Sequence, residues 1–202
     1  MNKKITLLVA THNPGKVQEY AEMLPGLDIT WLTLDSAGIR DEVEETGQTF
    51  QENAELKAVA YAQQSGLFTL ADDSGLEVDA LDGRPGVLTA RYGGPGLTPE
   101  ERYRHLLAEL EAVEPDVRTA RFRCTIALAG PDGEIVGTSS GVCEGEIALE
   151  PAGGGGFGYD PVFFLPGQGV TMAQLSAEEK HQISHRGQAL RAIAPLLHET
   201  LA

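Results

Sequence analysis

Short apolar runs alternate with amphipathic stretches along the N-terminal part of the chain. The runs at residues 5–10 and 29–34 are rich in leucine and β-branched residues, which predicts buried strands. Between them, apolar residues recur at helical spacing over residues 17–24, and Pro14 suits the first position of a helix. The pattern therefore predicts a strand, a tight turn and a helix that starts near Pro14.

Capping boxes predict the starts of three later helices. In this motif a Ser or Thr is followed three positions later by a Glu, and each satisfies a backbone N–H of the other. The boxes place the helix starts at Thr49, Thr98 and Ser176. The first of these helices carries Asn53 and Lys57 four positions apart, so both side chains are expected on one face.

Two further apolar runs flank a pair of acids. Residues 67–71 and 76–81 predict strands that enter and leave Asp72 and Asp73, and Gly75 predicts a sharp turn between the strands. Adjacent side chains on an extended segment point to opposite faces, so at most one of the two carboxylates faces a given cleft. A polar turn with an Asx hydrogen bond is the alternative interpretation.

The middle of the chain predicts a long β-ribbon. Residues 119–129 alternate apolar and polar, as expected of a half-exposed strand, and a Pro-Asp-Gly turn signal leads into a return strand at 135–149. Such a ribbon indicates an antiparallel or mixed sheet and not a purely parallel one. Apart from a glycine run there is no repeat, linker or low-complexity tract, so one domain over residues 1–202 is expected, with two lobes around a cleft.

Composition narrows the classes of function. The 202 residues are 42% hydrophobic and 22% charged, which is typical of a globular domain with its own core. A net charge of −15 argues against a broad surface for nucleic acid or an anionic membrane. Two cysteines cannot form a disulfide framework or a zinc ribbon. The apolar run at the start is far shorter than the about 20 residues of a membrane helix, so a cytoplasmic location is expected.

An anion site is expected where the first strand meets the first helix. Free backbone N–H groups and the helix dipole favour negative charge at a helix N-terminus, and a lysine adds a mobile positive charge. The spacing of a Walker A loop is absent, and an ordinary capped helix with a solvated lysine stays the alternative. The segment consists of Thr11, His12, Asn13, Pro14, Gly15 and Lys16.

Clustered acids indicate a metal site as one of two alternatives. Mg²⁺ is typically held by one or two protein carboxylates together with phosphate oxygens of a substrate. Glu44 or Glu45 can complete such a site with Asp73. The alternative is that the acids of the 41–47 segment form a solvated loop.

The C-terminal part offers a loop and a turn suited to reading a ligand. Residues 153–158 match Gly-x-Gly-x-x-Gly, but a dinucleotide fingerprint should precede a helix, and this run leads through Phe157 into an apolar strand. Such a loop can instead form a flat slot for a nucleobase, or be a flexible loop anchored by core aromatics. His181 and His185 lack the Glu of a zincin, so the turn at His185 and Arg186 is interpreted as ligand-reading and not as a zinc site.

Several motifs occur in order over almost the whole chain. They are Ala-Thr-His-Asn-Pro-Gly-Lys, Glu-Glu-Thr-Gly with Glu-Asn-Ala, Ala-Asp-Asp-Ser-Gly-Leu, Ala-Arg-Tyr, Gly-Phe-Gly-Tyr-Asp-Pro and Ser-His-Arg-Gly-Gln-Ala. Each is modest alone, and jointly they are highly specific. In this set the chain resembles the inosine triphosphate pyrophosphatase family, enzymes that hydrolyse non-standard purine nucleoside triphosphates.

The resemblance implies a fold, a reaction and a set of site residues. The fold is a mixed α/β architecture with a long curved central sheet flanked by helices, two lobes with a cleft between them, and a homodimer. The reaction is Mg²⁺-dependent hydrolysis of ITP, dITP or XTP to the monophosphate and pyrophosphate. Asp73 is implied as proton acceptor and metal ligand, with Glu44 or Glu45 sharing the metal. Substrate contacts are expected of Thr11, His12, Asn13, Pro14, Gly15, Lys16, Asn53, Lys57, Ser74, Phe157, Gly158, Tyr159, Asp160, Lys180, His185 and Arg186.

Hydrogen-bond chemistry predicts which base is selected. Arg186 is a donor only, so it favours a purine with a keto oxygen at position 6 over adenine, which presents an amino group there. Two alternatives stay open: a pyrophosphatase for modified pyrimidine triphosphates, and a module that binds nucleotide or nucleic acid without catalysis. The acidic composition weighs against nucleic acid.

Overall fold

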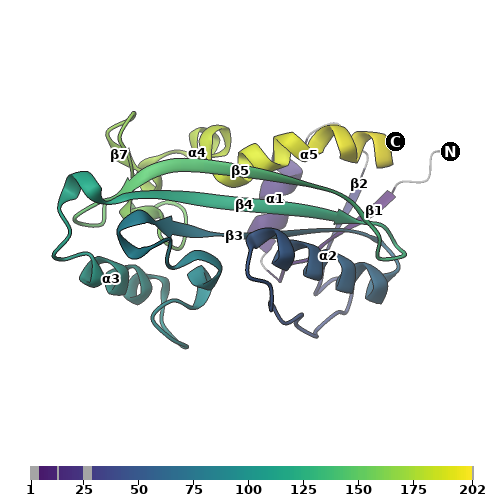
Figure 1. Ribbon diagram of the computed structural model, residues 1–202. Coiled ribbons are helices and arrows are strands. Elements are labelled where there is room, and N and C mark those ends of the chain that lie inside the picture. The colour runs from purple at the N-terminus through teal and green to yellow at the C-terminus, as the bar shows by residue number, and fades with distance from the viewer. Residues whose placement is uncertain (1–4, 13, 25–28, 202) are drawn as a thin grey trace. The chain divides into compact units, whose positions relative to one another are not determined.

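Seven strands form one mixed sheet in the described part of the chain (Figure 1). The structure is a computed structural model that describes residues 5–12, 14–24 and 29–201. The strands are β1 (Ile5–Val9), β2 (Ile29–Thr33), β3 (Phe68–Val78), β4 (Thr119–Ala129), β5 (Ile135–Ile147), β6 (Phe163–Leu165) and β7 (Val170–Thr171). Their order is β2-β1-β3-β4-β5-β6-β7. β1 pairs in parallel with β2 and β3, whereas β6 pairs antiparallel with β5 and β7, so the sheet is mixed, as predicted.

The helices begin where the sequence places their caps. The α-helices are α1 (Pro14–Met23), α2 (Phe50–Ser65), α3 (Pro99–Glu109), α4 (Ala177–Ile183) and α5 (His185–Leu201). The three predicted capping boxes at Thr49, Thr98 and Ser176 are all formed, each with both of its reciprocal hydrogen bonds. Short 3₁₀ turns connect the longer elements at Asp79–Leu81, Gly86–Arg91, Pro115–Val117, Asp160–Val162 and Met172–Gln174.

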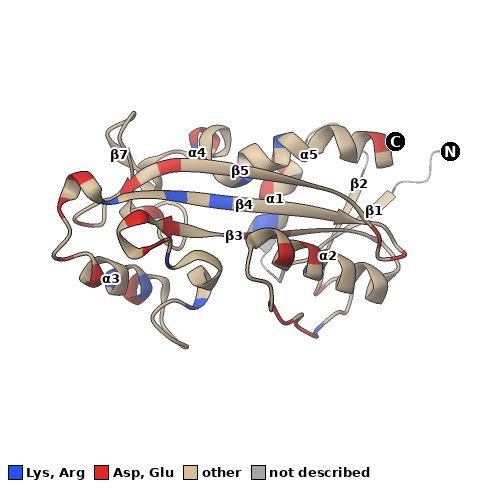
Figure 2. Cartoon of the chain, in the orientation of Figure 1, with Lys and Arg blue, Asp and Glu red and all other residues tan. Residues whose placement is uncertain are grey.

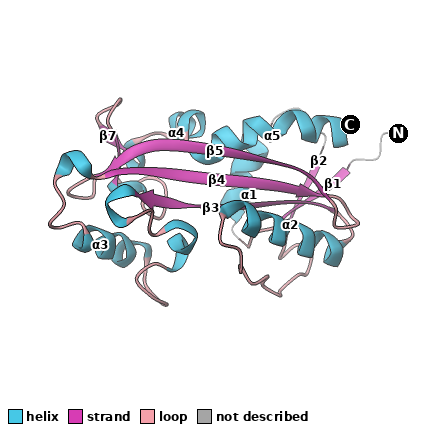
Figure 3. Cartoon of the chain, viewed as in Figure 1, coloured by secondary structure: helices cyan, strands magenta, loops and turns pink. Residues whose placement is uncertain are grey.

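The chain divides into two compact units that share the three long strands, which lie next to one another in Figure 3. Unit 1 comprises residues 1–73, 124–141 and 186–202, and unit 2 comprises residues 74–123 and 142–185. β3, β4 and β5 each have one part in unit 1 and the other in unit 2. The expectations of one domain over residues 1–202 and of a cleft stay predictions.

Unit 1 is a three-layer arrangement of helices on both faces of the sheet. On one face α1 and α5 pack on the sheet through a core that includes Tyr20, Leu190 and Ile126. On the other face α2 packs through small residues such as Ala54 and Ala58. Figure 1 shows α5 and α2 on opposite sides of the sheet. Because both faces are covered, the unit 1 part of β4 is buried throughout, whereas only its unit 2 part follows the predicted alternation.

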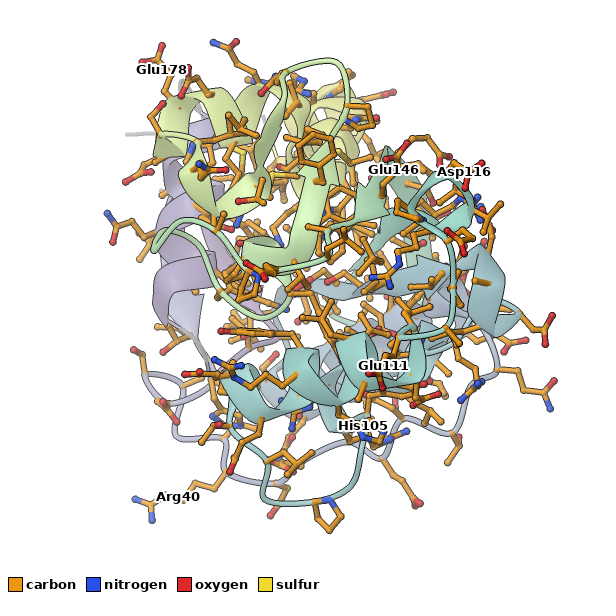
Figure 4. The ribbon with its side chains drawn as sticks, turned by 90° about the vertical axis from the view of Figure 1, so that its left-hand side faces the viewer. Arg40, His105, Glu111, Asp116, Glu146 and Glu178 are labelled. Carbon is orange, nitrogen blue, oxygen red and sulfur yellow. The ribbon has the colours of Figure 1, made fainter. Side chains whose placement is uncertain are left out.

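Unit 2 has its own core. Leu106 of α3 packs in one apolar cluster with Leu76 of β3 and Phe163 of β6, and all three are fully buried. Charged side chains of this unit project outward, including His105 and Glu111 in Figure 4. In the described chain no helix is long and apolar enough to span a membrane.

The predicted turn at the acidic pair is wrong. Asp72, Asp73 and Gly75 lie inside the continuous strand β3, which runs from Phe68 to Val78 without a break. The residues of β3 that pair with β1 run from Phe68 to Leu70, and β4 is the hydrogen-bonded neighbour of β3 on its other side. The physical reason for the strand is its pairing with β4, because a turn would take backbone groups of β3 away from that pairing. The glycine is tolerated within the strand instead of ending it.

Candidate active site

The two adjacent aspartates of β3 face different helical layers of unit 1. Asp72 contacts Lys16 of α1 and Arg186 of α5, while Asp73 contacts Asn53 and Lys57 of α2. The strand geometry is the cause, because neighbouring side chains on an extended backbone point to opposite faces. Two carboxylates that are adjacent in sequence therefore sit in two different electrostatic environments.

Asp72 lies in a buried cluster with two cations. The Lys16 Nζ donates to both carboxylate oxygens at 2.9 and 3.1 Å, and the Arg186 Nη2 lies 3.5 Å from Oδ2. Arg186 is itself buried and its Nη1 donates to Glu19 at 3.3 Å. Burial alone would raise the pKa of Asp72, but the charges of Lys16, Arg186 and Lys57 outweigh it and hold that pKa well below its usual range. Asp72 is therefore a permanent anion that holds the two cations in place.

Asp73 is held by α2. The Asn53 Nδ2 donates to Asp73 Oδ2 at 3.2 Å, and the Lys57 ammonium lies 3.5 Å from Oδ1. The same ammonium donates to Glu45 at 2.6 Å, so it lies against both carboxylates. Asn53 and Lys57 are thus on one helical face, as their spacing predicts, and that face meets the acidic loop as well as β3.

The acidic loop is fixed to α2 by Asn53 and a glycine. The Gly47 N–H donates to Asn53 Oδ1 at 2.8 Å, so the one amide group joins the loop to β3 through Asp73. A Cβ at Gly47 would lie 2.6 Å from that oxygen and 2.7 Å from the Cβ of Glu52, which is closer than atoms approach. The Glu-Glu-Thr-Gly and Glu-Asn-Ala motifs therefore form one local structure that places Glu45 beside Lys57.

The two aspartates have pKa values shifted in opposite directions. Burial raises the pKa of Asp73, and the opposing effect of Lys57 does not cancel it. Burial also disfavours the charged form of Lys57, but Asp73, Asp72 and Glu45 together raise its pKa. Carboxylates whose environments separate their pKa values are typical of acid and base assignments in enzymes. Asp73 is accordingly the carboxylate of the pair suited to accept a proton.

The donors around Lys57 fit a Mg²⁺ ion that arrives with a substrate. Glu45 and Asp73 supply the hard oxygen ligands that Mg²⁺ prefers, and a cationic group already lies against both carboxylates. Within the described residues no group of three or more His, Cys, Asp or Glu is placed to hold a metal. Two carboxylates are enough only if phosphate oxygens and water complete the coordination.

A second polar cluster lies within unit 2 at the glycine-rich loop. The Lys180 Nζ donates to the buried Asp160 at 2.6 Å and lies 4.5 Å from the centre of the Phe157 ring. The Phe157 N–H donates to Asp160 Oδ2 at 2.8 Å. Gly156 has a φ of +70°, and a Cβ there would collide with Asp160 Oδ2. No α-helix follows the glycines, which confirms that they are not a dinucleotide fingerprint.

Other predicted site residues of unit 2 have contacts that support the fold. Tyr159 is buried and its hydroxyl donates to the Thr89 carbonyl at 3.1 Å, while the His185 ring stacks on Phe122 at 4.8 Å between centroids. Gly158 lies in the same loop with a φ of +62°, and Ser74 is half-buried on β3. His181 and His185 belong to different helices, since α4 ends at Ile183, so their helical spacing has no meaning.

The predicted phosphate segment is described in part. Thr11 lies two residues after the end of β1, and the His12 Nδ1 lies 2.9 Å from the exposed Asp35 carboxylate. Pro14 and Gly15 open α1, and Lys16 reaches Asp72 from its first turn. Asn13 lies outside the described residues, so its predicted role in capping and phosphate binding is not addressed.

Sequence reasoning missed Glu19 as a member of the Asp72 cluster. Glu19 lies three residues after Lys16 on α1 and accepts from Arg186 at 3.3 Å. The i, i+3 spacing puts Lys16 and Glu19 on one face of the helix and was the available signal. The partner on α5, Arg186, is 167 residues away in sequence, and no local pattern joins the two.

Known proteins are similar along nearly the whole chain. The model of the Ham1 family matches residues 7–196. A dITP/XTP pyrophosphatase from Geobacter sulfurreducens is 53% identical over 184 residues, covering 91% of this chain and 92% of that protein. A protein of the same name from Bacillus subtilis is 47% identical over 190 residues, covering 94% and 96%.

Solved structures agree with this similarity. The structure of a HAM1 protein from Coxiella burnetii superposes with a TM-score of 0.89 at 44% identity, covering 96% of this chain and 99% of that one. The Staphylococcus aureus Ham1 protein gives a TM-score of 0.87 at 40% identity, with the same coverage. The fold, the family match and the identity over nearly the full length agree, and this chain belongs to the Ham1 family.

Proposed function

We propose that this chain hydrolyses non-standard purine nucleoside triphosphates, of the dITP and XTP kind, to the monophosphate and pyrophosphate. The observation that carries the proposal is the identity of about half of all positions with proteins named dITP/XTP pyrophosphatase over more than nine-tenths of the chain. The opposite pKa shifts of Asp72 and Asp73 support it, because they supply a fixed anion and a proton acceptor side by side.

Asp73 is proposed as the proton acceptor for the attacking water. Its pKa is raised by burial, so its carboxylate binds a proton more readily than an exposed aspartate. Asn53 fixes the carboxylate by its 3.2 Å hydrogen bond, which leaves the proton-accepting oxygen in a defined orientation. Mg²⁺, when bound to Asp73 and Glu45 or Glu44, would supply positive charge for the phosphates and lower the pKa of a bound water.

The triphosphate is proposed to bind at the cations of unit 1. A phosphoryl group crowded by negative oxygens needs positive charge that is already in position before the reaction. Lys16 and Lys57 are held in place by Asp72 and by Glu45, and the segment from Thr11 to Lys16 ends at the start of α1, where backbone N–H groups favour anions.

The base is proposed to be recognised by Phe157, Asp160, Lys180 and the turn at His185. The Phe157 ring, 49% exposed, has the size and position on its loop to stack on a purine, and Asp160 and Lys180 fix the loop beneath it. The proposed role of Arg186 in favouring a keto oxygen follows from its donor-only chemistry. Its contacts to Asp72 and Glu19 hold the guanidinium in one orientation.

A nucleotide panel tests the proposed function. Release of pyrophosphate, as distinct from orthophosphate, is measured for ITP, dITP and XTP against ATP, GTP, UTP and TTP, with Mg²⁺ and with EDTA. The keto purines other than GTP should exceed ATP by about a hundredfold or more in kcat/KM, since unpaired buried donors discriminate strongly. Preferential hydrolysis of the pyrimidines, or binding without turnover, would replace the proposal by one of its alternatives.

The Asp73→Asn variant tests the assignment of the proton acceptor. It keeps the shape of the side chain but replaces one acceptor oxygen by an NH₂ donor and cannot accept a proton, so kcat should fall by about a hundredfold or more with a native circular dichroism spectrum. Asp116→Asn, which changes an outward-facing carboxylate (Figure 4), is the matched control and should be unchanged. Near-normal pyrophosphate release by Asp73→Asn would contradict the assignment.

The homodimer, the Mg²⁺ requirement and the cytoplasmic location are part of the same proposal. The homodimer and the Mg²⁺ requirement rest on the resemblance of the motifs to the family, and the cytoplasmic location rests on the short apolar run at the start and the two cysteines. Light scattering on a sizing column measures the mass of the particle in solution, for which a dimer of the 21.5 kDa chain is expected. Restoration of the EDTA-treated enzyme by Mg²⁺ tests the metal requirement.

A further inference from the structure

We propose that Lys57 is a positioning residue that stands in for the metal between Glu45 and Asp73, so that a divalent cation binds well only together with a triphosphate. The inference rests on the proposed function and extends it, because it selects Glu45 over Glu44 as the second carboxylate and assigns to Lys57 a competition with the ion.

The geometry places one ammonium against the two carboxylates of the proposed metal site. The Lys57 Nζ lies 2.6 Å from Glu45 Oε1 and 3.5 Å from Asp73 Oδ1. The Lys57 side chain is only 13% exposed, and those of Glu45 and Asp73 are 29% and 12% exposed. Charges so poorly solvated need partners, and in the protein without metal the ammonium is the partner of both.

Glu44 is in a different position. It is exposed, as expected of alternating residues along the extended loop, whereas its neighbour Glu45 is half-buried and points to Lys57. Asn53 holds the loop through the Gly47 N–H and holds Asp73 through its own amide, so the positions of Glu45 and Asp73 are set by the same side chain. The carboxylate that shares a cation with Asp73 is therefore Glu45.

The charge balance explains why metal and triphosphate bind together. Two carboxylates and one ammonium carry a net charge of −1, and a divalent ion placed between the carboxylates would meet the lysine charge at close range. Repulsion between like charges at such distances is strong in a partly buried site, where solvent screens it poorly. A triphosphate adds negative charge that accepts both cations, so Lys57 moves onto phosphate oxygens and the carboxylates become free for the ion.

Metal binding by the protein without nucleotide tests the inference. The binding of Mn²⁺, as a paramagnetic substitute for Mg²⁺, is measured by electron paramagnetic resonance and titration calorimetry for the wild type, Lys57→Met and Lys57→Arg. Lys57→Met keeps an unbranched side chain, one atom shorter and without the charge, and should bind Mn²⁺ about tenfold more tightly, in line with the effect of one charge within 4–6 Å. Lys57→Arg keeps the charge and should stay near the wild type.

A second set of variants identifies the carboxylate. In the Lys57→Met background, Glu45→Gln should abolish the gain in Mn²⁺ affinity, while the matched change Glu44→Gln should leave it in place. Lys57→Gln serves the same comparison if Lys57→Met does not give a native circular dichroism spectrum. Unchanged or weaker Mn²⁺ binding on removal of the lysine charge overturns the stand-in role, and loss of the gain with Glu44→Gln overturns the choice of Glu45. Neither readout uses turnover, so a failure of the proposed function is scored separately by pyrophosphate release.

Discussion

At the scale of single residues, the acidic pair of β3 is differentiated by position alone. Asp72 is held ionised by Lys16 and Arg186, and Asp73 is shifted toward its protonated form by burial. The two pKa shifts do not come from the chemistry of the side chains, since both residues are aspartates. The strand directs one toward α1 and α5 and the other toward α2, so the fold and not the residue type decides in which direction each pKa shifts.

Asn53 is expected to be a residue on which the site depends for stability as well as for geometry. It is 1% exposed and is hydrogen-bonded to both Gly47 and Asp73. Asn53→Ala should therefore lower the free energy of unfolding by about 2 kcal/mol, since it leaves buried polar groups unpaired. Urea unfolding measures the change, and Gln51→Ala on the exposed face of α2 is the control. A loss no larger than in Gln51→Ala would contradict this role.

The sequence indicated which residues belong to the candidate site better than it indicated which of them contact one another. Spacing placed Asn53 and Lys57 on one face, and the structure adds that this face meets Glu45 and Asp73. The contacts of Arg186 with Asp72 and Glu19 were not predictable, because they join residues far apart in sequence. Periodicity reports which side of an element is apolar, but it carries no information on which distant element covers it.

At the scale of elements, caps and turns followed the local chemistry while β3 did not. The capping boxes formed where predicted because their hydrogen bonds are between residues three positions apart. The turn expected at Gly75 was replaced by a strand because β3 pairs with β4, which is a tertiary effect.

The glycine-rich loop of unit 2 offers a test at this scale. In Gly156→Ala the new methyl group collides with Asp160 Oδ2 and the residue must keep a φ of +70°, so the variant should lose about 2 kcal/mol or more of unfolding free energy. Gly154→Ala is the matched control, since nothing lies within 4 Å of its Cβ position. Chemical denaturation of both variants measures the difference, and equal stabilities would show that Asp160 is not fixed by this glycine.

At the scale of the whole molecule, two properties involve most of the chain: its negative net charge and the three strands that belong to both units. Figure 2 shows acidic residues spread over many loops and helices, with basic residues on β4 among them, in keeping with the net charge of −15. The mixed α/β class was predicted from the sequence and the resemblance. Two lobes were expected as well, but the residues at which the two compact units divide were not predicted, because the strands β3, β4 and β5 run continuously from one unit into the other.

Shared strands predict that the two units unfold together. Leu106 of α3 is fully buried in unit 2, and Leu106→Ala should cost about 2–5 kcal/mol. The one tryptophan of the chain, Trp31 on β2, reports on unit 1. If unfolding is cooperative, the urea midpoint of Trp31 fluorescence falls in Leu106→Ala by as much as the midpoint of the circular dichroism signal. A fluorescence midpoint that does not move would show independent unfolding.

The unbroken course of β3 limits how this protein can change in evolution. A deletion or insertion of one residue shortly before Asp72 would turn the following side chains over, and the proposed proton acceptor, Asp73, would then face the lysine and arginine that now hold its neighbour. Substitutions along this strand are compatible with the site, but insertions and deletions of single residues are not. Insertions and deletions among related sequences are accordingly expected in the surface turns and not between Leu70 and Asp73.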